Sequence, residues 1–308
     1  MTEHHPSGEL YLHADDFGIS DKQVDKLVRL AKEGMIASVS VFAADRKLAG
    51  HLSALLGAVP GIRIAVHLNF VEGPSVLGHD VLPDLTDTSG YFDRSYLALL
   101  IRGLIPVRGR LYRQLREEAH AQIETVRKAL PEGAPLAIDT HQHTFGIPVV
   151  CAAVLDAAAA VREVREARVP AERLRPYRGN GAVLRRIPAA NYIKLLLLRF
   201  LLWTQRRRIR ASGLVVPAFS GVLMTDGVEE PDIRALIPAL RKESVRQGRP
   251  MEILFHPARI ETREECPDPD NLPFVRFNMS ARRDMDERLV RAAAEEIDLL
   301  AESDQTIR

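Results

Sequence analysis

Short apolar runs, many of them β-branched, alternate with longer amphipathic segments along most of this 308-residue chain. The patterning predicts six strands, at residues 10–14, 36–42, 62–68, 136–139, 164–169 and 251–255. It predicts helices at residues 20–34, 48–59, 111–130, 149–161, 188–210, 233–247 and 284–300. Strands that alternate with helices favour a parallel sheet, so the predicted fold class is α/β.

The chain shows no internal repeat and no break in composition, so we expect one domain over residues 1–308. Hydrophobic residues make up 46% and charged residues 27%, which excludes a disordered or collagen-like protein. Cys151 and Cys266 lie far apart, which argues against a disulfide framework. The predicted loops at 72–91 and 261–273 are long enough to be functional.

Histidine and aspartate side chains gather where predicted strands end. The ends of four strands read His13-Ala-Asp15-Asp16, His67-Leu-Asn69, Asp139-Thr-His141-Gln-His143 and Phe255-His256-Pro257. In a β/α barrel the carboxyl ends of all strands meet on one face. We therefore expect these distant residues to converge on one site that binds a metal ion.

Each signal also has a structural explanation when it stands alone. The Asp15-Asp16 pair could place negative charge at a helix N-terminus, and His67 could be a buried histidine with satisfied hydrogen bonds. His141 and His143 are two residues apart, so on an extended segment both would point to the same side. Their joint position at strand ends favours the shared metal site.

Four segments resemble the YdjC-like carbohydrate deacetylase family in order and spacing: HADDFGIS, VHLNFVEG, DTHQHTFGIP and EILFHP. The resemblance extends from about residue 10 to residue 277. It implies a distorted TIM-like (β/α) barrel with long βα loops, and hydrolysis of the N-acetyl group of an N-acetylglucosamine-type conjugate. The segments VLPDLTDTSGYF, RVPAE and GLVVPAFSGV resemble the hopanoid-biosynthesis-associated branch most, which implies a glycosylated hopanoid lipid as substrate.

Carried over by motif, the resemblance implies that Asp16, His67 and His141 bind the metal ion. It implies that Asp15 is the catalytic base and that His256 is the general acid. The sequence departs from the family pattern after this histidine, where Pro257-Ala258 stands in place of the usual Pro-Gly.

The residue types fit this chemistry without the analogy. A divalent metal held by one carboxylate and two imidazoles keeps positions open for water and for a substrate carbonyl. This ligand set suits Zn, Co, Ni or Mn, whereas Mg, which is often linked with the family, prefers oxygen ligands. A second carboxylate can accept a proton during attack, and a histidine can protonate the leaving amine.

Three further residues are expected around the metal ligands or in contact with substrate. Asp139 could accept the second ring N–H of His141, or it could cap a turn. His143 is expected to face the same side as His141. Arg168 is expected either at the pocket rim or on the solvated exterior of the barrel.

A basic segment interrupts an otherwise acidic chain. Residues 173–225 hold eleven basic and no acidic side chains, while the remainder carries ten more acidic than basic ones. We interpret this segment as a helical insertion with two open explanations. Residues 194–210 could form a buried helix with a cationic end, or a surface that contacts an anionic membrane. Nucleic acid is not expected as a partner, because no aromatic residues are interleaved with the basic ones.

Other functions compete with the deacetylase of a lipid-linked sugar. These are a deacetylase of soluble chitooligosaccharides, a metal-dependent phosphoesterase and a non-enzymatic membrane-surface scaffold; a homodimer is also left open. Residues 1–9 lack the apolar core of a signal peptide, and the densest apolar run, 195–203, is about half the ~20 residues of a spanning helix. We therefore expect a cytoplasmic protein, peripheral at the inner membrane surface if the basic segment binds lipid.

Overall fold

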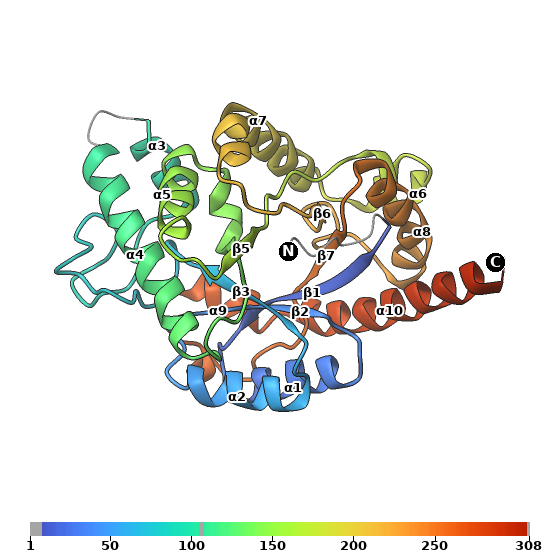
Figure 1. The fold of residues 1–308 in the computed structure, drawn as a ribbon, viewed down its shortest axis with the longest axis horizontal. Coiled ribbons are helices and arrows are strands. Elements are labelled where there is room, and N and C mark those ends of the chain that lie inside the picture. Colours follow the sequence, from blue (N-terminus) through green and yellow to red (C-terminus); the bar gives the residue numbers. More distant parts are fainter. Residues whose placement is uncertain (1–7, 105–107, 307–308) are drawn as a thin grey trace.

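Seven parallel strands form one curled sheet in the computed structural model, which describes residues 8–104 and 108–306 (Figure 1). The strand order is β5-β4-β3-β2-β1-β7-β6. The strands are β1 Leu10–Phe17, β2 Ser38–Val41, β3 Arg63–Leu68, β4 Leu136–Thr140, β5 Val164–Ala167, β6 Ala218–Ser220 and β7 Met251–Phe255.

Helices surround the outer face of this sheet (Figure 1). They are α1 Asp21–Lys32, α2 Leu48–Ala58, α3 Tyr96–Arg102, α4 Arg108–Lys128, α5 Pro148–Ala158, α6 Gly181–Arg186, α7 Ala189–Ala211, α8 Glu230–Gln247, α9 Leu272–Asn278 and α10 Arg282–Thr306. Short 3-10 turns occur at η1 His141–Gly146, η2 Arg175–Tyr177 and η3 Arg263–Glu265.

The sheet curls like a distorted TIM-like barrel but does not close fully. Its two edge strands, β5 and β6, do not pair with each other in the described residues, and the segment before β6 joins them. There Val215 N donates to Arg165 O, and Val215 O accepts from Ala167 N, both at 2.9 Å. The α/β class is thus confirmed, whereas the barrel is an incomplete one.

All six predicted strands are present, and four elements escaped the sequence patterns. β6 has three residues, too few for a period to be visible. The helices α3, α6 and α9 have six or seven residues each, shorter than the windows in which helical periodicity is readable.

The two faces of the sheet differ in chemistry. Along β1, Leu12 and Ala14 point toward the helices and join the main apolar core. Tyr11, His13 and Asp15 alternate with them and point into the curl of the sheet, where all three are buried. The interior of the half-barrel is therefore lined with polar and charged side chains, which need partners there.

None of the described helices has both the length and the apolar character that crossing a membrane requires. The expectation about the polar N-terminus falls mostly on residues 1–7, which lie outside the described part of the chain.

Candidate metal and catalytic site

A backbone irregularity at the end of β1 makes both aspartates available to the interior. The register of β1 against β2 shifts between Ala14 and Phe17, and Asp16 adopts a left-handed conformation with φ 69°. On a regular strand Asp15 and Asp16 would point to opposite faces. The bulge turns Asp16 inward as well, so both carboxylates lie buried on the same side.

Asp16, His67 and His141 converge, as the sequence predicts. His67 Nε2 lies 3.3 Å from Asp16 Oδ1 and 3.1 Å from His141 Nδ1, and His141 Nδ1 lies 3.4 Å from Asp16 Oδ1. Ligands about 2.0–2.2 Å from one ion lie about 2.8–3.6 Å from one another at tetrahedral to octahedral angles. The three atoms therefore have the spacing of ligands around a single ion.

The hydrogen bonding of the three side chains also leaves these atoms free for a metal. Asp16 Oδ1 is buried and has no hydrogen-bond partner among the described residues. A carboxylate can only accept, so Asp139 Oδ1 fixes the proton of His67 on Nδ1, 2.5 Å away. Likewise Glu72 Oε2 fixes the proton of His141 on Nε2, at 2.8 Å. Each lone pair that remains points at the centre of the triad, so the donor set fits a divalent ion.

The carboxylates around His67 and His141 favour a positive charge between the three candidate ligands. Burial disfavours a charged His67, but Asp139 and Asp15 outweigh it and raise its pKa to about 10. Burial also disfavours a charged His141, but Asp16 and Glu72 outweigh this effect and raise the pKa of His141. Burial opposes the ionisation of Asp16, but Arg283 and the two histidines outweigh this effect. They hold the pKa of Asp16 well below its usual range. A metal ion would take the place of protons in this negative pocket.

The partner of Asp139 is neither of the two that the sequence suggested. The sequence left two roles open for Asp139, as the partner of His141 or as the cap of a turn, but its carboxylate binds His67. The reason is sheet register: His67 and Asp139 are direct neighbours on β3 and β4, whereas the chain leaves the strand after Thr140. Glu72, in the loop after β3, orients His141 instead.

His143 was expected to face the same side as His141 on an extended segment, but the segment is not extended. After β4 the chain turns into η1, in which Gln142 and His143 are both left-handed, with φ 53° and 58°. His143 is buried, and its ring centroid lies 5.7 Å from that of Phe219. Burial and the charges of Lys194 and Arg168 hold the pKa of His143 well below its usual value, so it stays neutral.

Arg168 lies in the interior of the half-barrel rather than at its rim or on its exterior. Its Nη1 and Nη2 donate to the two oxygens of Asp15 at 2.9 and 2.8 Å. Its Nη2 is also 3.1 Å from Asp139, and its Nε donates to Glu252. Burial opposes ionisation of Asp15, but Arg168 outweighs it and holds the pKa of Asp15 well below its usual range.

A second group of possible ligands, His13, Asp15 and Asp139, lies next to the first. His13 binds the hydroxyls of Ser38 and Ser40 at 2.8 and 2.6 Å, and Arg168 neutralises both carboxylates. The positive charge that this group could attract is thus supplied by the chain itself. The described residues therefore favour one metal ion rather than two.

His256 lies across from Asp15, at the edge of a cavity of about 210 Å³. Its Nε2 is 3.9 Å from Asp15 Oδ2, and its ring packs on Phe277 with centroids 5.5 Å apart. Burial lowers the pKa of His256 to about 4, so the resting side chain is neutral. Two residues later, Ala258 is left-handed with φ 70°, the conformation that favours the glycine usual at this position in the family.

Sequence patterns missed Arg283, which is fully buried at the beginning of α10. It donates from Nη2 to Asp16 Oδ2, the oxygen that does not face the histidines, and its guanidinium lies 4.7 Å from the Phe277 ring centroid. No motif surrounds it in the chain. Glu72, by contrast, belongs to the VHLNFVEG segment, so that motif was the signal for its role.

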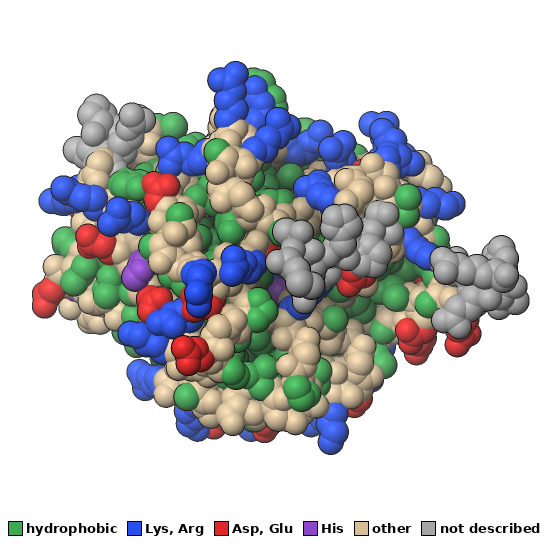
Figure 2. Space-filling model, viewed as in Figure 1, with side chains coloured by type: hydrophobic (Ala, Val, Ile, Leu, Met, Phe, Trp, Pro, Cys, Tyr) green, Lys and Arg blue, Asp and Glu red, His purple; other side chains and the backbone are tan. Residues whose placement is uncertain are grey.

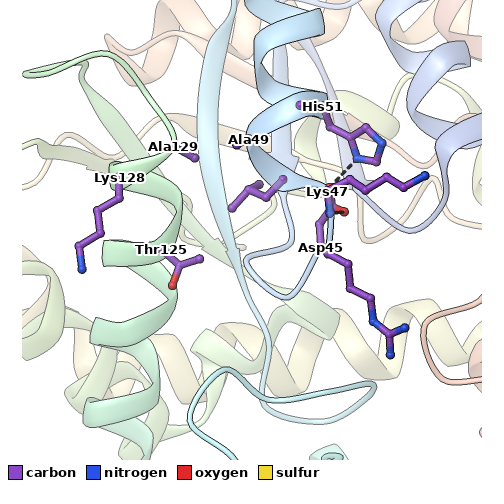
Figure 3. Close-up of a pocket in the computed structure, with 10 residues that line it drawn as sticks. Asp45, Lys47, Ala49, His51, Thr125, Lys128 and Ala129 are labelled. Carbon is purple, nitrogen blue, oxygen red and sulfur yellow. Dashed lines mark hydrogen bonds and ion pairs between the residues drawn. The ribbon is translucent and has the colours of Figure 1, made fainter.

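A wider surface groove lies elsewhere, between α2 and the C-terminal end of α4 (Figure 3). Its wall includes Asp45 and His51, whose Oδ2 and Nδ1 are 2.6 Å apart, together with Thr125 and Lys128. None of the three candidate metal ligands lines it. The buried triad, and not this groove, therefore carries the candidate chemistry.

Residues 9–301 match the family described as YdjC-like protein. A carbohydrate deacetylase from Vibrio campbellii (strain ATCC BAA-1116) is 28% identical over 141 residues, 46% of this chain. The match spans about half of that relative, 51% of its length. A solved structure described as a cellobiose-phosphate cleavage protein, from Enterococcus faecalis V583, has the same fold, with a TM-score of 0.59, 17% identity and 94% of each chain covered. The family match over residues 9–301, nearly the whole chain, shows that this protein belongs to the YdjC-like family.

Proposed function

We propose that this chain is a metal-dependent deacetylase that hydrolyses the N-acetyl group of an N-acetylglucosamine-type sugar conjugate and releases acetate. The observation that carries the proposal is the unpartnered Asp16 Oδ1 within 3.4 Å of two imidazole nitrogens, beside Asp15 and His256. Membership of the YdjC-like family and the carbohydrate deacetylase relative support the same activity.

Asp16, His67 and His141 would hold the metal. Bound there, a divalent ion supplies Lewis-acid chemistry, which an acetamide needs because it is a poor electrophile. Zn, Mn, Co and Ni suit the mixed oxygen and nitrogen ligands better than Mg. Asp139 and Glu72 set the ring orientation of the two histidines, and Arg283 holds the remaining oxygen of Asp16.

Asp15 is the proposed base. Two parallel hydrogen bonds from Arg168 hold its carboxylate in one orientation and keep it ionised until a proton of the attacking water reaches it. His256 is the proposed acid, but its low pKa leaves it without a spare proton at rest. We therefore propose that the proton accepted by Asp15 passes to His256, whose Nε2 is 3.9 Å away. His256 then gives this proton to the leaving amine.

The proposed activity has two candidate substrates, a sugar linked to a lipid such as a hopanoid and a soluble chitooligosaccharide. The exposed apolar side chains of α7 favour the lipid-linked form. A phosphoesterase with two metal ions is disfavoured, because Arg168 neutralises the second group of carboxylates. A scaffold without activity would not need a buried, unpartnered carboxylate oxygen, which is costly to keep.

Acetate release from both substrate forms, together with metal analysis of the same protein, tests the proposal. His141→Ala should lose most of the bound metal and all activity. Asp15→Asn and His256→Ala should keep the metal and lose about 10²–10⁴-fold in rate, the usual cost of an acid or base. His120→Ala, an exposed histidine of α4, is the matched control and should change neither readout. Unchanged turnover in Asp15→Asn, or full metal content in His141→Ala, would reject the assignment.

A further inference from the structure

The helices α3 and α7 present an unusual amount of apolar surface to solvent. Most of the large apolar side chains that are exposed in the described residues lie on these helices or directly after α3: Leu97, Ile101, Leu104, Ile193, Leu196, Leu197, Phe200 and Trp203. We call these residues the α3–α7 surface. Phe200 is 61% exposed and Trp203 is 59% exposed, values far above those of core aromatic residues.

On α7 these side chains form one stripe. Positions 193, 196, 197, 200 and 203 recur at three- and four-residue spacing, so they lie on one side of the helix. Leu195, Leu198 and Leu202 are buried and lie on the opposite side, where α7 packs against α5. The helix is thus apolar on two faces, and the described chain covers only one of them. The explanation of residues 194–210 as a buried helix therefore accounts for only one face of α7.

The charged side chains on the helices that form this surface are all basic, and one of them, Arg208, pairs with Asp156 of α5 at 3.6 Å. Neither α3 nor α7 contains an acidic residue. Arg199, Arg207 and Arg210 are exposed and form no ion pair with any described residue, and Arg206 stacks on Trp203 with its guanidinium 4.4 Å from the ring centroid. Figure 2 shows Lys and Arg side chains gathered along the upper edge of the molecule, where Figure 1 places α7.

The two helices are close to each other and to the candidate site. A Cβ added to Gly146 would lie 2.7 Å from Leu198 of α7 and 3.1 Å from the hydroxyl of Tyr96 of α3, so both helices pack on this glycine. At the beginning of α7, Asn191 donates to Thr225 O at 2.5 Å. Thr225 lines the same cavity as His256. The beginning of α7, two residues before the first α7 member of the α3–α7 surface, is therefore one contact away from that cavity.

We propose that the α3–α7 surface docks on the face of a lipid bilayer that contains anionic lipids. An exposed apolar stripe with a tryptophan, bordered by unpaired arginines, has the chemistry of a helix that lies in the membrane interface. The apolar side chains enter the headgroup boundary while the arginines reach the phosphates. Docking would hold the His256 cavity beside the bilayer, where a lipid-linked sugar would be presented.

A second copy of this chain fits the surface less well. A two-fold contact through α7 would place the same arginines of both copies near each other, and neither α3 nor α7 offers an acidic partner. Anionic headgroups supply the missing charge, so the bilayer is the better match for the surface.

Flotation with lipid vesicles tests the proposal on the full chain without any substrate, so its result is independent of the deacetylase activity. Vesicles of phosphatidylcholine with phosphatidylglycerol should carry the protein, and vesicles of phosphatidylcholine alone should carry much less. Changing Arg199, Arg207 and Arg210 to Gln should lower the partition coefficient on the order of 100-fold, at about fivefold per arginine. Changing Phe200 and Trp203 to Ser should lower it at least about tenfold.

Matched control variants separate docking from general effects of charge or surface polarity. Arg29→Gln, Lys32→Gln and Arg46→Gln together remove the same charge from exposed positions on and near α1 and α2, which Figure 1 places opposite α7. Val245→Ser and Leu299→Ser remove exposed apolar side chains from α8 and α10. Both controls should float like wild type.

Equal flotation of the surface variants and their controls, or no flotation of wild type at low salt, overturns the proposal. A wild-type dimer that Phe200→Ser with Trp203→Ser converts to monomer, without lipid binding, would assign the surface to a second copy.

Discussion

Asp15 and Asp16 are adjacent in the chain, yet each binds a different arginine and is proposed for a different role. Asp15 forms two hydrogen bonds to Arg168, while Asp16 gives one oxygen to Arg283 and keeps the other free beside two histidines. The difference arises from a single left-handed residue in β1. At the residue scale, therefore, partners rather than residue type separate a proposed base from a proposed metal ligand.

Glu72 provides a residue-scale prediction. Its carboxylate fixes the proton of His141 on Nε2, which leaves Nδ1 free to bind a metal. Glu72→Ala should weaken metal affinity about 10–100-fold, the usual effect of losing the partner of a ligating histidine. Glu72→Gln should weaken it less, because an amide oxygen still accepts. Titration calorimetry with Zn²⁺ on chelator-treated protein measures both effects. Glu117→Ala, which removes an exposed charge from α4, should bind as wild type does. An equal affinity for Glu72→Ala and wild type would contradict this role.

At the scale of elements, the ends of the strands determine where the chemistry lies. β4 ends at Thr140, and the left-handed pair Gln142 and His143 then folds the chain into η1. His141 follows the extended Thr140 directly, and its Nδ1 already lies 3.1 Å from His67 Nε2 before the turn redirects the chain. The same turn points His143 toward Phe219 instead of toward the metal ligands.

The left-handed position of Gln142 gives the element-scale prediction. Its side chain is exposed, so a substitution there acts mainly through the backbone. Gln142→Val should lower the free energy of unfolding by about 1–2 kcal/mol, because a β-branched residue is strained at positive φ. Gln142→Gly should stay within about 0.5 kcal/mol of wild type, since relief of strain offsets the added freedom of the unfolded chain. Urea denaturation measures both values. A Val variant as stable as the Gly variant would show that the turn is not left-handed.

At the scale of the whole molecule, the three candidate ligands come from the ends of β1, β3 and β4, so the metal site exists only in the folded sheet. A ligand that binds only the folded state raises its stability by about 2.7 kcal/mol at a free concentration of 100 times Kd. We therefore expect Zn²⁺ added to chelator-treated protein to raise Tm by roughly 4 °C.

Thermal unfolding with and without metal checks this expectation. His141→Ala should show little or no shift, whereas His120→Ala should shift as wild type does, because its imidazole is exposed on α4 and belongs to neither group of possible metal ligands. A metal-induced shift of the same size in His141→Ala would place the binding site elsewhere in the molecule.

The amino-acid sequence by itself determined the α/β class, six of the seven strands and the convergence of Asp16, His67 and His141. Those predictions rest on local periodicity and on the rule that parallel strands end on one face, and both can be read along the chain. Only the tertiary structure decided which side chains pair. Register places Asp139 beside His67, a bulge turns Asp16 inward, and α10 brings Arg283 from 267 positions away in the chain. It also decided that α7 buries one apolar face and exposes the other, because burial depends on what the rest of the chain packs against a helix and not on its own pattern.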